Sequence, residues 1–179
     1  MADPFETLGI AASFDVDLGA LEQRHRDLSR VLHPDRHVGG SPAERRMSLG
    51  KAIEVNDAFR VVRDPIRRAE ALLALHGILV KEGAEPKASP AFLMETLEKR
   101  EELADARARR DRGAIERLAK EVAARQDSAI EKLSVGFRAE AGDSMRKLVP
   151  LVGELRYYQR FLEEVSAIED EQSSQEQAS

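Results

Sequence analysis

The sequence predicts an all-α protein, and three observations support this prediction. Aromatic residues make up only 4% of the 179 residues and tryptophan is absent, whereas alanine, leucine, glutamate and arginine dominate. Strong helix formers therefore stand where a sheet would need β-branched and aromatic residues. Apolar residues also recur at spacings of three and four, which places them along single faces of helices. Prolines and glycines divide the chain into segments of helix length.

The composition also excludes several kinds of site. The chain has no cysteine, so it offers no disulfide, no thiolate ligand for zinc or an iron–sulfur cluster, and no cysteine nucleophile. Its first residues are acidic rather than basic, and no apolar run approaches the ~20 residues of a membrane helix. We therefore expect a cytoplasmic protein with no resident cofactor and no membrane contact.

Residues 1–77 predict a helical hairpin with a connecting helix. One helix begins near Leu18 and stops before Pro34, with His25 in register with its leucines. The next begins where Ser41 can cap it and ends at Asp64, before a proline that cannot continue the hydrogen-bond ladder. Matching apolar stripes favour antiparallel packing of the two helices, with His25 packed between them. The stripes consist of Leu21, Leu28 and Leu32, and of Ala52, Val55, Phe59 and Val62.

Residues 78–88 predict a linker because they combine low hydrophobicity with glycine and proline. Three long helices then predict a helical bundle over residues 89–168. Pro150 lies inside the last of these helices, which it should kink or divide. Residues 169–179 contain almost nothing apolar, so we expect a disordered acidic tail there, and this tail disfavours general nucleic-acid binding.

A His33-Pro34-Asp35 tripeptide joins the two helices of the hairpin. By itself it is a common helix stop, but basic residues surround it and the second helix closes with Asn56-x-Ala58-Phe59 before Asp64-Pro65. These features together resemble a J-domain, the module with which DnaJ-type proteins stimulate DnaK-type chaperone ATPases.

The resemblance becomes more specific beyond the hairpin. Three further segments resemble the HscB co-chaperones of iron–sulfur cluster assembly, up to about Val165, although residues 107–143 are supported only by their helical pattern. The segments are Asp64-Pro65-x-x-Arg68-Ala69-Glu70-x-Leu72-Leu73, Leu75-His76-Gly77 and Phe92-Leu93-Met94-Glu95-x-Leu97-Glu98-x-Arg100-Glu101-Glu102-Leu103.

The resemblance implies two docking sites. A rigid proline turn within positive potential would contact the ATPase domain of an HscA/DnaK-type chaperone. An adaptable apolar cluster with a charged rim would bind an IscU-type iron–sulfur scaffold protein. The implied chaperone-binding residues are His33, Pro34, Asp35, Arg26, Arg30 and Arg36. The implied scaffold-binding residues are Leu93, Met94, Leu97, Glu98, Arg100, Glu101 and Tyr157.

Other interpretations of these residues remain open. Leu93, Met94 and Leu97 could all be core residues, and Tyr158 replaces Tyr157 if the helical register slips by one. A metal site at His33 and His37 is disfavoured, because a proline turn would not align the two imidazoles. The basic run from Arg107 to Arg112 is interrupted by acids and lacks stacking aromatics, which disfavours RNA binding.

The predicted function is that of a co-chaperone that stimulates a chaperone ATPase and delivers the scaffold protein to it for cluster transfer. The chain is not expected to be an enzyme, because it shows no glycine-rich phosphate loop and no recognisable Ser, His and carboxylate set. The alternatives are a general J-domain protein that delivers unfolded clients, and a helical adaptor in which the tripeptide has no function.

Overall fold

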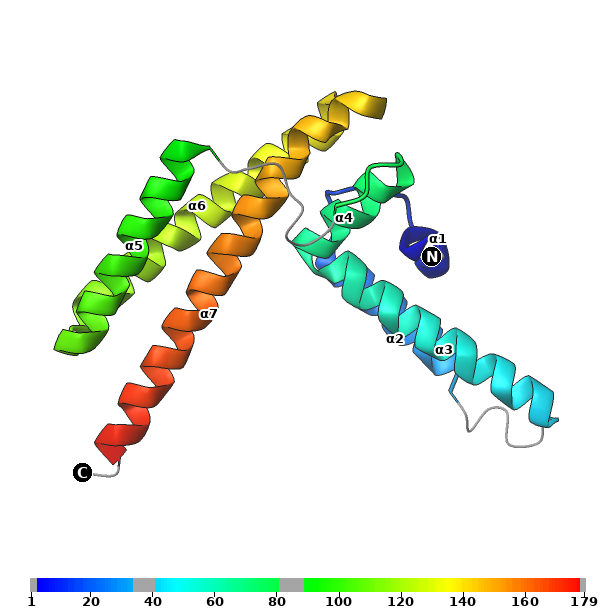
Figure 1. Cartoon of the computed structure of the whole chain (residues 1–179). Helices are drawn as coiled ribbons and strands as arrows, with labels where there is room; N and C mark the ends of the chain where they lie inside the picture. Colours follow the sequence, from blue (N-terminus) through cyan, green and yellow to red (C-terminus); the bar gives the residue numbers. More distant parts are fainter. Residues whose placement is uncertain (1–2, 34–40, 81–88, 178–179) are drawn as a thin grey trace. The chain divides into compact units, whose positions relative to one another are not determined.

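The computed structural model describes residues 3–33, 41–80 and 89–177 (Figure 1). Within these ranges all regular structure is helical, which confirms the predicted all-α fold. No helix in them is long and apolar enough to cross a lipid bilayer. The chain separates into two compact units. Unit 1 comprises Met1–Val80 and Phe137–Arg146, and unit 2 comprises Lys81–Gly136 and Lys147–Ser179.

Unit 1 is built around the predicted helical hairpin. Helices α1 and α2 both pack on α3 (Figure 1), and Leu21 of α2 and Val62 of α3 are almost completely buried. Phe5 and Leu8 of α1 complete this core, so the five-residue helix is held by packing rather than by its own length. The helices of unit 1 are α1 (Pro4–Leu8), α2 (Leu18–Val31), α3 (Pro42–Arg63) and α4 (Pro65–Leu75).

The predicted helix boundaries in unit 1 are confirmed by their caps. Ser41 and Glu44 form a capping box, in which the Ser41 hydroxyl accepts from the Glu44 backbone N–H and the Glu44 carboxylate accepts from the Ser41 N–H. The Asp64 carboxylate accepts hydrogen bonds from the backbone N–H groups of Ile66 and Arg67, both at 2.9 Å. A proline follows each capping residue, where its missing N–H costs nothing.

The predicted packing of His25 within the hairpin is also confirmed. Its ring lies parallel to that of Phe59, with the ring centroids 4.1 Å apart. Its Nε2 atom lies 2.8 Å from Oδ1 of Asn56, so α2 and α3 are joined by a polar contact as well as by apolar burial.

A buried arginine holds the loop before α2. Nη1 of Arg68 donates a hydrogen bond to the carbonyl of Val62 at 2.8 Å, and its guanidinium carbon lies 4.9 Å from the ring centroid of Phe14. Burial lowers the pKa of Arg68 from its ordinary value. Phe137 also stacks on Phe14, with the ring centroids 5.3 Å apart. Residues 137–146 therefore belong to unit 1, whereas the sequence assigned them to the bundle by helical pattern alone.

Unit 2 contains the predicted three-helix bundle of α5 (Pro90–Arg109), α6 (Arg112–Ala139) up to Gly136, and α7 (Val149–Gln177). Pro150 divides the last helix rather than kinking it, because the chain before it forms the short 3-10 helix η2 (Gly142–Leu148). Gly136 allows η2 to pack closely on α6, since a Cβ atom at this position would collide with Leu148.

The predicted disordered tail is wrong over residues 169–177, where α7 continues to Gln177. Arg107 of α5 forms an ion pair with Glu171 at 2.7 Å, and Ile168 is buried directly before this segment. The tail consists largely of Glu, Gln and Ser. A helix that is already formed propagates easily through glutamate and glutamine, so this composition extends α7 although it could not fold alone.

Candidate functional site

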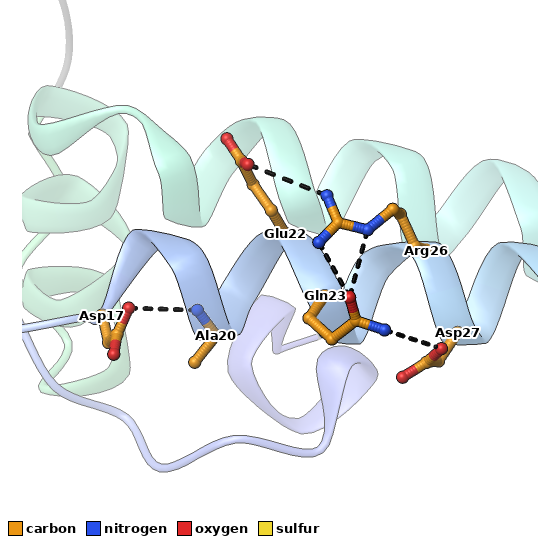
Figure 2. A network of polar contacts seen from close by, with 6 residues as sticks. All are labelled: Asp17, Ala20, Glu22, Gln23, Arg26 and Asp27. Atoms are coloured by element: carbon orange, nitrogen blue, oxygen red, sulfur yellow. Dashed lines mark hydrogen bonds and ion pairs between the residues drawn. The ribbon is translucent and has the colours of Figure 1, made fainter.

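The first candidate site follows the polar face of α2 and the residues after it. Glu22 and Arg26 lie on the same side of the helix, with Nη1 of Arg26 3.9 Å from the Glu22 carboxylate (Figure 2). The Arg26 guanidinium also donates to the side-chain oxygen of Gln23, at 2.8 Å and 3.3 Å. The Gln23 amide in turn donates to Asp27 at 3.1 Å (Figure 2).

These contacts continue along α2 to Arg30, another predicted chaperone-binding residue. We call the set of Glu22, Arg26, Asp27 and Arg30 the charge ladder. Nη1 of Arg30 lies 3.4 Å from Oδ1 of Asp27. The ladder therefore contains two cations and two carboxylates, all on one helix and in contact with water. Its formal charge is zero, so Arg26 and Arg30 supply less positive potential than two unpaired arginines would.

The end of α2 leads directly into the tripeptide. His33 is exposed just beyond the helix, and the hydroxyl of Ser48 on α3 donates to the Leu32 carbonyl at 3.1 Å. This bond holds the C-terminal end of α2 against α3. Pro34, Asp35 and Arg36, together with His37, lie outside the described residues. In the described part of the chain, no group of three His, Asp or Glu side chains could hold a metal ion.

The second candidate site is the outer face of α5. Leu93, Met94 and Leu97 are 55%, 58% and 54% exposed. The alternative that all three are core residues is therefore wrong, and the core position on this helix belongs to Leu103, which is 1% exposed. Three large apolar side chains within two turns of one helix form an exposed patch of the kind that marks a binding site.

Ion pairs to α6 hold α5 with this patch facing outward. Nζ of Lys99 lies 2.7 Å from Glu121, and an Arg125 nitrogen lies 2.8 Å from the Glu95 carboxylate. The hydrogen bond to Glu121 raises the pKa of Lys99, and the same bond lowers the pKa of Glu121. These charged residues occupy the inner flanks of α5, so they orient the helix without covering its apolar patch.

Tyr157 of α7 is bonded to the backbone of α5, and it differs in its surroundings from its neighbour Tyr158. The Tyr157 hydroxyl donates to the Thr96 carbonyl at 3.0 Å, and the guanidinium carbon of Arg100 lies 6.0 Å from its ring centroid. Burial raises the pKa of Tyr157. Tyr158 is 6% exposed. The predicted register, with Tyr157 nearer the surface, is therefore the one observed.

An acidic edge borders the apolar patch. Glu98 and Glu101, both predicted site residues, are exposed. Asp105 extends the same edge one turn further, a position that sequence reasoning missed although its spacing of seven from Glu98 signals a shared face. None of the three carboxylates has an ion-pair partner within the described ranges. This edge is therefore free to meet positive charge on a partner.

Comparisons with known proteins identify the relatives of this chain. A family model described as "HSCB C-terminal oligomerisation domain" matches residues 88–166. A "Co-chaperone protein HscB homolog" from Ralstonia nicotianae is 37% identical over 150 residues, which cover 81% of this chain and 85% of that relative. The chain belongs to the HscB co-chaperone family. Another HscB homolog, from a Shewanella species, is 31% identical over 167 residues and covers 93% of this chain and 96% of its own.

Solved structures of HscB proteins share the fold. The chaperone HscB from Vibrio cholerae matches with a TM-score of 0.83 and 30% sequence identity, covering 94% of this chain and 98% of its own. The human co-chaperone protein HscB matches with a TM-score of 0.84 and 28% identity, covering 93% of this chain and 82% of its own. The HscB fold therefore extends over nearly the whole chain, including the parts that the sequence supported only by helical pattern.

Proposed function

We propose that this chain is a co-chaperone of iron–sulfur cluster assembly that stimulates the ATPase of an HscA/DnaK-type chaperone and delivers an IscU-type scaffold protein to it. One observation carries the proposal: a member of the HscB family combines a His-Pro-Asp tripeptide at the hairpin turn with an exposed Leu93, Met94 and Leu97 patch on a separate helix. The cluster is cargo of the scaffold protein, so the co-chaperone itself needs no metal ligand.

Chaperone docking is proposed at the hairpin turn. Proline restricts its own backbone, so the tripeptide would lose little conformational entropy when His33 and Asp35 bind the chaperone. Arg26, Arg30 and Arg36 would orient the approach toward a negatively charged surface. ATP hydrolysis would take place on the chaperone, and no catalytic group of this chain would take part. We place this role in the cytoplasm.

Scaffold docking is proposed on α5. Burial of the apolar patch would supply most of the affinity, and Glu98, Glu101 and Arg100 would fix the orientation of the partner. Methionine at the centre of the patch adapts its shape easily, which suits an interface that must release its cargo. Tyr157 would contribute at the edge of the apolar patch, since its ring lies beside the Arg100 guanidinium.

A steady-state ATPase assay tests this proposal with a purified HscA/DnaK-type chaperone, the full chain and an IscU-type scaffold. Stimulation should rise when co-chaperone and scaffold are both present, and Asp35→Asn or His33→Gln should abolish it. Asp57→Asn serves as the matched control, because Asp57 is an exposed aspartate of the same hairpin and should leave stimulation unchanged. Full stimulation by a folded Asp35→Asn variant would contradict the proposal. If an unfolded client replaced the scaffold with equal effect, the chain would be a general J-domain protein.

A further inference from the structure

One face of α3 carries a row of exposed side chains that are not part of the core. Arg46, Leu49, Ile53 and Asn56 follow one another at spacings of three, four and three, which places them on one face of the helix. Leu49 and Ile53 are 54% and 53% exposed, although the opposite face of α3 supplies buried core residues such as Val55. Two large apolar side chains therefore lie in water one turn apart.

Two contacts place this row beside the proposed chaperone site. At one end, Oδ1 of Asn56 lies 2.8 Å from Nε2 of His25, so this end of the row lies beside α2. Toward the other end, Ser48, the neighbour of Leu49, bonds to the Leu32 carbonyl immediately before His33. The row thus accompanies α2 until the tripeptide begins, within one compact unit.

The distribution of charge on the hairpin distinguishes the two helices. Arg26 and Arg30 are already paired with Glu22 and Asp27 on their own helix. Arg46 is exposed and has no ion-pair partner within the described ranges. A partner with a negative surface must compete with Glu22 and Asp27 for the arginines of α2, whereas it meets Arg46 without such competition.

We propose that Arg46, Leu49 and Ile53 form a second docking strip for the chaperone, beside the His-Pro-Asp turn. The inference rests on the proposed function. The strip fits a part of the chaperone ATPase domain that offers an apolar surface bordered by a carboxylate. Leu49 and Ile53 bury against the apolar surface, and Arg46 pairs with the carboxylate. Affinity then comes mainly from α3, while the tripeptide delivers the signal for hydrolysis.

The chain offers matched controls for each variant. Met47 is 59% exposed and lies on the opposite side of α3 from Leu49, two residues away. Lys51 is exposed and lies on the opposite side of the helix from Ile53. Met47→Ala therefore controls for loss of exposed apolar surface, and Lys51→Gln controls for loss of one positive charge on the same helix.

The experiment is a titration of chaperone ATPase stimulation with each full-length variant, accompanied by circular-dichroism melts. Leu49→Ala with Ile53→Ala should raise the half-maximal concentration about tenfold, as expected for interface anchors. Arg46→Gln should raise it about two- to fivefold, with the effect shrinking at high salt. The α3 variants should keep the maximal stimulation, the melting temperature and the scaffold binding of the parent chain. Both control variants should behave like the parent chain in every measurement.

Several outcomes would overturn the inference. One is that the Leu49 and Ile53 variant behaves like Met47→Ala. Another is that sedimentation shows self-association of the parent chain that this variant abolishes, in which case the strip binds a second copy. The Asp35→Asn variant distinguishes failure of the docking-strip proposal from failure of the proposed function. If Asp35→Asn abolishes stimulation while the α3 variants change nothing, only the docking strip is wrong; if Asp35→Asn is inert, the proposed function fails first.

Discussion

Helices α2 and α5 are both proposed docking helices, yet they arrange their charges in opposite ways. On α2, Arg26 and Arg30 each pair with an acid three or four residues before them on the same helix. On α5, Lys99 and Glu95 pair with α6, and the outer carboxylates of Glu98 and Glu101 are left without partners in the described structure. The apolar content differs too, because three exposed leucine and methionine side chains lie close together on α5, whereas the exposed Leu18 and Val31 of α2 lie at its two ends.

This difference indicates that the two partners are recognised by different physical terms. Paired arginines steer a charged partner weakly, so the proposed docking to the chaperone would depend on the tripeptide and on neighbouring surfaces. A clustered apolar patch with a free acidic edge provides burial for affinity and charge for orientation. We therefore expect unit 1 to pass the signal for ATP hydrolysis to the chaperone, and unit 2 to bind the scaffold protein.

The largest expected effect tests whether α5 holds its partner by burial. Replacing Leu93, Met94 and Leu97 together by alanine should weaken scaffold binding by roughly a hundredfold or more, because interface anchors typically cost ~1 to 3 kcal/mol each. The melting temperature should be preserved, since all three side chains are exposed. Titration calorimetry and thermal melts measure the two effects.

The control for the α5 variant is a true core residue of the same helix. Leu103→Ala should lower the free energy of unfolding by about 2 to 5 kcal/mol. If the triple variant melts like Leu103→Ala, the patch is structural and the contrast between the helices is lost.

The next effect compares a buried cation with the exposed pairs of α2. Arg68→Ala should lower the free energy of unfolding by about 2 to 4 kcal/mol, because it leaves the Val62 carbonyl without its donor and removes the packing on Phe14. Arg26→Gln should cost less than about 1 kcal/mol, as exposed ion pairs do. Urea denaturation measures both. Equal destabilisation by the two changes would show that the α2 ladder is structurally important.

A smaller effect concerns the acidic edge of α5. Glu98→Gln with Glu101→Gln should slow association with the scaffold by about two- to fivefold at low salt, because unpaired exposed carboxylates steer a cationic partner. Glu102→Gln is the control, since Lys99 already pairs with Glu102 at 3.5 Å. Stopped-flow measurements at two salt concentrations would reveal the effect. Faster association of the double variant would mean that the scaffold surface is acidic.

The smallest expected effect concerns Glu154 of α7. Burial raises the pKa of its carboxyl, with a further rise from Glu95 and an opposing effect of Lys132. Because the pKa is higher in the folded state, ionised Glu154 destabilises the fold at neutral pH, and this penalty disappears as the pH falls below the ordinary glutamate range. Glu154→Gln should therefore raise the melting temperature slightly at pH 7 and leave it unchanged near pH 4. A lower melting temperature at pH 7 would mean that Lys132 outweighs burial.

Local sequence by itself determined where several of the helices begin. Ser41-Pro42, Asp64-Pro65 and Ser89-Pro90 each place a capping side chain before a proline, and the caps occur as the residues predict. Helix starts are predictable because the interactions that make them span only two or three residues. The His-Pro-Asp tripeptide and the apolar run on α5 were visible in the same way, as short patterns with a known chemical meaning.

Only the tertiary structure decided which face of each helix remains in water. Phe92 contacts Tyr157 and Tyr158 of α7, whereas its neighbour Leu93 is exposed. The stacking of Phe137 on Phe14 joins residues more than a hundred positions apart. Extension of α7 into the acidic tail likewise accompanies an ion pair to α5. Such contacts link residues that are distant in sequence, so neither periodicity nor composition encodes them.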